Sequence, residues 1–170
     1  MVDIENEKGV DTMGISLKKE EMIEYLERMK VQGENFRCML WGTVYAKPSS
    51  FSNHSKFTVG MADPDSALPG LVGSLNNAFC YIGITEKSLY VVAVDTYDTS
   101  RITGTFALPF ANITSLNTRK NLGSSTVEIE SGDFVSLTVK STSIGTNIKD
   151  QKERMAEFLA AMELLKGGIR

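Results

Sequence analysis

Apolar positions divide the chain into a helical stretch near its start, a long series of strand-like stretches, and a second helical stretch at its end. In residues 17–31 the apolar side chains recur every three or four positions, as on one face of a helix. Ser16 is its predicted N-cap and Gly33 its predicted end. We therefore assign residues 15–32 to an N-terminal helix, and the polar, aperiodic residues 1–14 to a flexible tail.

Short alternating stretches follow, separated by clusters of turn residues. The predicted strands are residues 36–46, 78–85, 89–94, 101–108, 113–118, 126–131 and 134–141. Between the first two strands, residues 47–77 are rich in Ser, Asn, Gly and Pro, which predicts a long loop. Strands joined by short turns in this way are typical of an antiparallel sheet.

The last part of the chain predicts an amphipathic helix over residues 147–166, with Asn147 as its cap and two glycines at its end. Its apolar stripe consists of Ile148, Met155, Phe158, Leu159, Met162 and Leu165. The predicted fold is mainly β, of the α+β class. A barrel-like domain over residues 33–170, of about seven antiparallel strands, is capped by the C-terminal helix and carries an extra N-terminal helix.

The first predicted strand is apolar on both faces. Phe36, Cys38, Leu40 and Val44 alternate on the face expected to fill the barrel. The other face would leave an apolar patch open unless something covers it. We expect the N-terminal helix to cover it, in its own chain or in a neighbouring copy. The candidate interaction residues on these two elements are Met22, Leu26, Met29, Met39, Trp41 and Tyr45.

Composition and charge exclude several classes of function. The net charge of −3 does not favour binding to nucleic acid or to an anionic membrane. The longest apolar run, residues 89–94, is far shorter than the roughly 20 residues that span a bilayer, and the N-terminus has no secretory signal. Cys38 and Cys80 lie in strand-like sequence, so we expect buried reduced thiols in a cytoplasmic protein; a disulfide between them is the alternative.

No set of residues predicts catalysis. His54 is the only histidine, and it lies in a loop without a nucleophile motif around any serine. One histidine and two separated cysteines do not supply a zinc site, and the sequence around Asp63 lacks the glutamate of a calcium loop. Glu128 and Glu130 share the predicted solvent face of a strand. We therefore expect no enzyme activity, catalytic residue, metal or cofactor.

Two segments resemble a known family. "YIGITEKSLYVVAV", residues 81–94, resembles a strand, turn and apolar strand of bacterial pleckstrin-homology-like domains, and residues 106–133 resemble the segment that follows. With Gly33-Glu34 before the first strand, the chain over about residues 33–166 resembles such a domain of the YokE kind. The resemblance implies a pleckstrin-homology-like barrel that serves as an interaction module. The chain departs from the pattern in its long first inter-strand loop and in Ser88, where an arginine is usual.

We therefore expect a non-enzymatic module that binds a protein partner or itself. The alternative is a small-ligand or lipid-head-group module that uses the 47–77 loop with Arg101, Arg119 and Lys120. Phosphoinositide-binding relatives carry several cations in the first inter-strand loop, whereas this loop has two lysines against two aspartates. We therefore expect no specific phosphoinositide binding, no nucleic-acid binding and no membrane insertion.

Overall fold

The computed structural model describes residues 16–46, 58–60, 75–131, 134–142 and 145–169. The predicted tail at 1–14 and most of the predicted 47–77 loop, including His54 and Asp63, lie outside the described residues.

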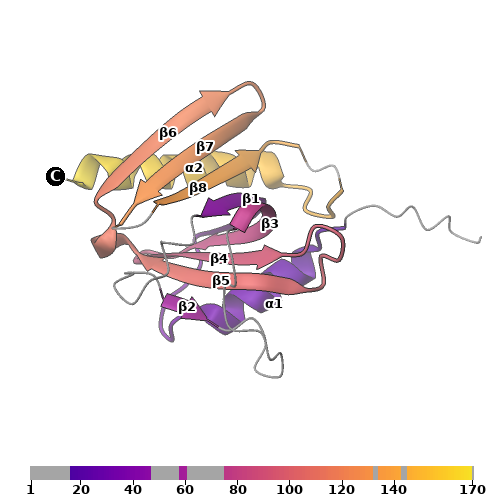
Figure 1. Cartoon of the computed structure of the whole chain (residues 1–170). Helices are drawn as coiled ribbons and strands as arrows, with labels where there is room; N and C mark the ends of the chain where they lie inside the picture. Colours follow the sequence, from indigo (N-terminus) through magenta and orange to yellow (C-terminus); the bar gives the residue numbers. More distant parts are fainter. Residues whose placement is uncertain (1–15, 47–57, 61–74, 132–133, 143–144, 170) are drawn as a thin grey trace, which may run out of the picture.

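The described residues form two α-helices, a short 3-10 helix and eight strands (Figure 1). In chain order these are α1 (Lys19–Met29), β1 (Cys38–Ala46), β2 (Thr58–Gly60), β3 (Leu75–Ile84), β4 (Ser88–Val94), β5 (Ile102–Pro109), η2 (Phe110–Asn112), β6 (Ser115–Asn121), β7 (Ser124–Glu130), β8 (Phe134–Lys140) and α2 (Gln151–Gly168). The strands form one antiparallel sheet in the order β2-β5-β4-β3-β1-β8-β7-β6. All seven predicted strands are present, and the predicted pleckstrin-homology-like α+β fold class is confirmed. The short β2 lies within the segment that was predicted to be a loop.

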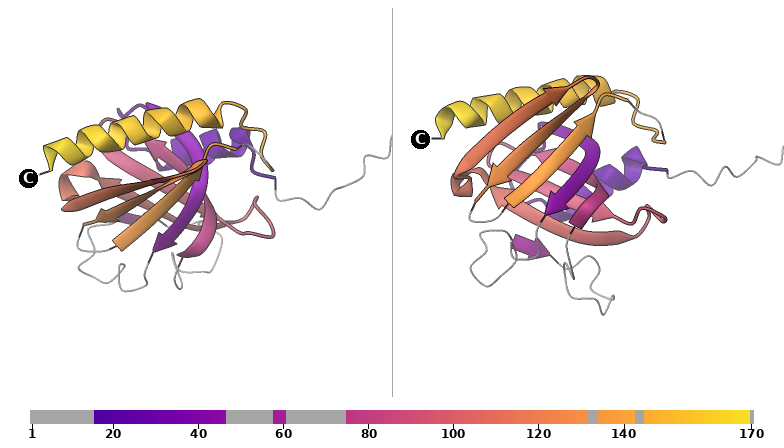
Figure 2. Two further views of the ribbon diagram at one scale, coloured as in Figure 1. Left: turned by 90° about the horizontal axis from the view of Figure 1, so that it is seen from above. Right: turned by 45° about the horizontal axis from the view of Figure 1, so that its top comes forward.

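The sheet bends into two halves that enclose the main hydrophobic core. Strands β3–β5 and β6–β8 lie on either side of β1, and α2 runs along the second half (Figures 1 and 2). Helix α2 contacts β1, β6 and β8. Phe158 and Met162 of its predicted apolar stripe are fully buried among inward-facing side chains of β1 and β3–β8. The C-terminal helix therefore closes the barrel, as the stripe predicts.

Helix α1 lies on the outer face of the sheet. It contacts β4, β1 and β3, and its Met22 and Leu26 are fully buried in a second cluster that includes Trp41. This is the predicted cover of the first strand, and it forms within one chain. Phe36 differs from the prediction: it packs on this outer cluster, not in the barrel, with its ring 5.6 Å from the ring of Tyr90. The reason is that β1 begins only at Cys38, so the strand alternation does not extend back to Phe36.

Gly83 makes room for this outer layer. A Cβ atom at this position would lie 2.5 Å from Cε1 of Phe36 and 3.2 Å from Cδ1 of Leu26. Contacts this short force displacement, so the absence of a side chain on β3 lets Phe36 and α1 approach the sheet.

The predicted helix caps are wrong at both N-termini. Helix α1 begins at Lys19, and Oδ1 of Asn147 accepts a hydrogen bond from the Lys19 N–H at 2.6 Å. Asn147 therefore caps α1 and not α2, which begins four residues later at Gln151. The physical cause is tertiary: Leu17 and Thr146 form a parallel bridge that brings the chain before α2 beside the start of α1.

Candidate functional site

The predicted interaction residues serve mainly the packing of α1. Met22 and Leu26 are fully buried and Trp41 is 5% exposed, all three within the outer cluster. Met29 and Met39 are half-buried against the same cluster. Tyr45 lies apart, with its ring 6.4 Å from the ring of Phe134 on β8. The structure thus brings five of the six together, inside one chain.

Two tyrosine hydroxyls fix the ends of α1 on this cluster. The Tyr81 hydroxyl accepts a hydrogen bond from the Lys18 N–H at 3.1 Å, and the Tyr90 hydroxyl accepts one from the Val31 N–H at 3.2 Å. The Tyr90 hydroxyl also donates to Glu34 at 2.9 Å. Burial raises the pKa of both phenols, to about 12 for Tyr81. These contacts hold α1 on the sheet.

The three predicted anion-binding residues are not brought to one place. Arg101 follows the turn between β4 and β5 and pairs with Asp95 at 3.6 Å, whereas Arg119 lies on β6 in the other half of the sheet. Arg119 pairs with Glu128 on the neighbouring strand and lowers the pKa of that carboxyl. Lys120 follows Arg119 and has no ion-pair partner among the described residues. The two arginines are therefore already neutralised by carboxylates of the same chain.

An apolar groove opens at the end of the barrel where α2 ends. Strand β5 ends at Pro109, and the short helix η2 follows, with the Phe110 N–H bonded to the carbonyl of Lys87 at 2.8 Å. Ile113 then leads into β6, and the Thr114 N–H donates to the carbonyl of Glu130 at 2.8 Å. These hydrogen bonds hold one wall of the groove, and the last turn of α2 forms the other.

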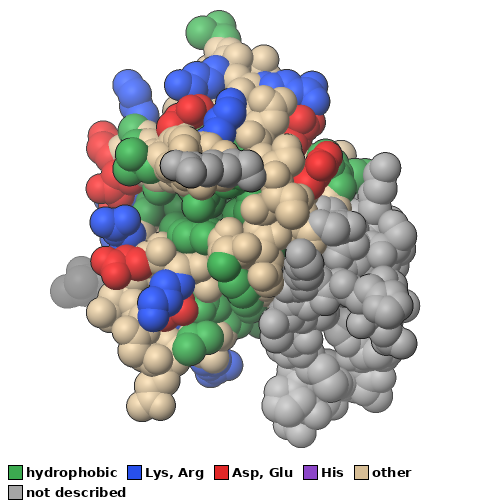
Figure 3. Space-filling view, turned by 90° about the vertical axis from the view of Figure 1, so that its left-hand side faces the viewer, with side chains coloured by type: hydrophobic (Ala, Val, Ile, Leu, Met, Phe, Trp, Pro, Cys, Tyr) green, Lys and Arg blue, Asp and Glu red, His purple; other side chains and the backbone are tan. Residues whose placement is uncertain are grey.

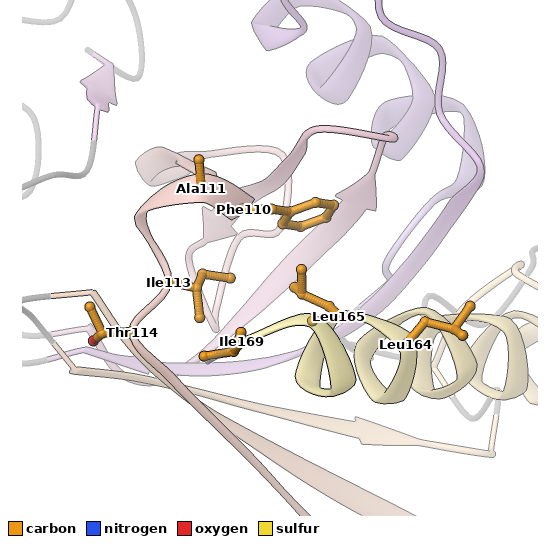
Figure 4. Close-up of a pocket in the computed structure, with 8 residues that line it drawn as sticks. Phe110, Ala111, Ile113, Thr114, Leu164, Leu165 and Ile169 are labelled. Atoms are coloured by element: carbon orange, nitrogen blue, oxygen red, sulfur yellow. The ribbon is translucent and has the colours of Figure 1, made fainter.

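This groove has a volume of about 560 Å³, and most of the side chains that line it are apolar. They are those of Phe110, Ala111, Ile113, Thr114, Leu164, Leu165 and Ile169, with Gly168 completing the wall. Phe110, Ile113, Leu165 and Ile169 converge on a common space between η2 and α2 (Figure 4). The space-filling view of this end of the molecule shows apolar side chains gathered in a hollow, with charged side chains around it (Figure 3).

The described side chains of the groove are largely apolar. Among the described lining residues none has a titratable side chain, and Thr114 supplies the one side-chain hydroxyl. Walls of this kind can bind apolar groups by excluding water. We name these lining residues the α2–η2 groove.

The cysteines and the acidic residues do not form a second site within the described residues. Burial raises the pKa of the Cys38 thiol to about 12 and raises that of Cys80 further, so both thiols are protonated at neutral pH. Both cysteines are buried and free. No group of three or more His, Cys, Asp or Glu side chains in the described part of the chain is arranged to hold a metal ion. Over the same residues, no helix is both long and apolar enough to cross a bilayer.

Sequence reasoning missed the α2–η2 groove. Leu165 was assigned to the buried stripe of the last helix and Ile113 to a strand, and neither assignment points to an open site. The signal in the sequence that could have indicated the groove was two apolar residues outside the predicted patterns. Leu164 lies off the stripe and is 78% exposed, and Ile169 follows the two glycines expected to end the helix.

Comparisons with known proteins give a likeness to a solved structure and no family. No protein-family model matches the chain, and no curated protein matches it. Among solved structures, the hSac2 domain from human phosphoinositide phosphatase Sac2 is similar at 12% sequence identity and a TM-score of 0.46. The match covers 88% of this chain and 80% of that chain. The fold assignment of this chain therefore rests on its own strand order and helix packing.

Proposed function

We propose that the chain is a non-enzymatic protein-binding module that takes an apolar side chain of its partner into the α2–η2 groove. The observation that carries this proposal is the exposure of apolar surface there: Leu164 is 78% exposed beside a groove formed largely by apolar side chains. The free energy of burying one large apolar side chain in such a groove is about −1.5 to −3 kcal/mol.

A protein partner accounts for this groove better than a charged small ligand. Phe110, Ile113 and Leu165 present no cation to a phosphate or carboxylate group. Arg101 and Arg119, the predicted cations, lie elsewhere and are paired. A partner polypeptide suits this groove, because its apolar side chain can fill the apolar walls while its backbone makes polar contacts at the rim of the groove.

The resemblance of residues 81–94 and 106–133 supports a finer proposal, that the chain is a bacterial pleckstrin-homology-like domain of the YokE kind. A cytoplasmic location belongs to the same proposal. Its support is that Cys38 and Cys80 are buried free thiols, which suits a reducing compartment.

The experiment is a selection of random displayed peptides on the immobilised wild-type chain, followed by affinity measurements with synthetic copies. We expect selected peptides to carry a large apolar residue. Their affinity should fall about tenfold on the Leu164→Ser variant, because one apolar side chain that lines the groove is removed. The matched control is Leu122→Ser, since Leu122 is fully exposed at the turn between β6 and β7 and lies outside the groove. Failure to select any peptide, or equal affinity for both variants, would overturn the proposal.

A further inference from the structure

We infer that the partner segment binds as an extended strand along the free edge of β6, with its apolar side chain in the α2–η2 groove and an acidic side chain beside Lys120. This inference rests on the proposed function and specifies the conformation and chemistry of the partner.

The first observation is that β6 is an edge strand. Its seven residues pair with β7 from Ser115↔Glu130 to Asn121↔Ser124, and β6 stands last in the order of the sheet. In an antiparallel pair, every second N–H and C=O of such a strand points away from its neighbour. Among the described strands only β7 pairs with β6, so these outward groups can form a ladder with an added strand.

The second observation is that the groove and this edge are continuous. Ile113 and Thr114 line the groove, and β6 begins at the next residue, Ser115. The Thr114 N–H and hydroxyl both bond to the Glu130 carbonyl, at 2.8 and 3.0 Å, so the chain enters β6 in a fixed direction. A segment with one side chain in the groove therefore lies next to the first residue of β6.

The third observation is the charge along β6. The strand has two cations and no acid, and Arg119 is already paired with Glu128. Lys120 is exposed and has no ion pair among the described residues. Thr114 beside the groove and Lys120 are six positions apart in an extended chain. If the added strand is antiparallel, which is the more stable arrangement, its acidic residue precedes its apolar residue by about six positions.

The test uses a synthetic peptide from the selection described above and two versions of it that are N-methylated at alternate residues. An N-methyl group removes one backbone donor and blocks that edge of the peptide. We expect one version to lose about tenfold or more in affinity and the other to change by less than about twofold, because only one edge of the peptide faces β6.

If both methylated versions bind like the parent while binding still depends on Leu164, the groove binds a partner without strand addition. This inference is then wrong and the proposed function stands. If no parent peptide shows dependence on Leu164, the proposed function itself fails. A doubling of the mass of the chain that is blocked by the peptide would identify a second copy as the occupant and would also overturn this inference.

Two further measurements locate the peptide. Lys120→Glu should weaken binding about two- to fivefold, as expected for one exposed ion pair. Lys152→Glu, an exposed charge reversal at the start of α2, is the matched control and should leave the affinity unchanged. Amide hydrogen exchange should slow at the outward N–H groups of β6 in saturating peptide. Unchanged exchange in β6, or slowing confined to another strand, would contradict strand addition.

Discussion

The side-chain oxygen Oδ1 of Asn147 lies 2.6 Å from the backbone nitrogen of Lys19, 128 positions earlier in the chain. The same side chain donates through Nδ2 to the Glu20 carboxylate at 3.0 Å. No side chain within α1 caps its N-terminus, so a residue from the segment after β8 satisfies one of the free N–H groups of the helix. The N-terminal helix is thus completed by the segment that leads into the C-terminal helix.

Replacement of Asn147 should destabilise the fold. Asn147→Ala removes the cap of α1, and we expect a loss of about 0.5–2 kcal/mol in the free energy of unfolding, measured by urea denaturation. The hydrogen bond from Asn147 also lowers the pKa of Glu20. The stabilisation from that bond is present above the ordinary pKa of the carboxyl and is lost as the pH falls through the lowered value. The difference between wild type and variant should therefore shrink in acid. Asn35→Ala, at another exposed asparagine, should have little effect.

Raising the pH should release α1 from the sheet. Burial raises the pKa of Tyr81 to about 12 from an ordinary value of 10. The folded state therefore holds this proton more tightly, and stability is lost as the pH rises from 10 to about 12. Tyr81→Phe should cost about 1 kcal/mol near neutral pH, because the Lys18 N–H loses its acceptor. The Tyr81→Phe variant should also lose less stability than wild type as the pH rises from 10 to about 12. A decline of equal size in wild type and variant would show that Tyr81 is not the titrating group.

Removal of side-chain volume from the buried face of α1 should loosen the outer cluster. Leu26 is fully buried, so Leu26→Ala should destabilise by about 2–5 kcal/mol. The fluorescence of Trp41, the only tryptophan, reports on the same cluster and should shift to the red at lower urea than in wild type. Leu122→Ala provides the comparison, since its side chain is fully exposed. If both variants melt alike, α1 does not contribute to stability.

The two faces of α2 should respond differently to the same substitution. Phe158→Ala should cost about 3–5 kcal/mol, because its side chain is fully buried in the barrel. Leu164→Ala on the same helix should change the unfolding free energy by less than about 0.5 kcal/mol, since Leu164 is mostly exposed. A loss for Phe158→Ala smaller than about 1 kcal/mol would show that α2 does not close the barrel.

We expect no specific binding to phosphoinositides. Arg101 and Arg119 are paired with carboxylates of their own chain, and the net charge of the chain is −3. Sedimentation with phosphatidylcholine vesicles, with and without a phosphoinositide, should give equal small bound fractions at about 0.15 M salt. Saturable binding that requires the phosphorylated head group, and that Lys120→Glu weakens, would contradict this expectation.

The sequence predicted those parts of the fold that depend on local periodicity. The alternation in residues 126–131 and 134–141 predicts β7 and β8, and their inward rows are fully buried. The stripe through Phe158 and Met162 likewise predicts how α2 packs. Each of these features follows from side chains on one element, and the strand and helix periods are enough to find them.

The features that the sequence did not predict depend on contacts between distant segments. Asn147 precedes a helix and looks like its cap, yet the bridge at Leu17 turns it towards another helix. Phe36 continues an alternating pattern, yet it lies before the start of β1 and packs on the opposite face. The α2–η2 groove exists because η2 and the end of α2 leave a gap between them. Local patterns do not contain such relationships.

The cap on α1 has a consequence for the order in which the protein folds as it is made. Lys19 leaves the ribosome long before Asn147, and the tyrosines that hold α1 are also synthesised later. A helix of 11 residues is marginal by itself. We therefore expect the first helix of the nascent chain to stay unfolded, with Met22 and Leu26 exposed, until Asn147 has been synthesised.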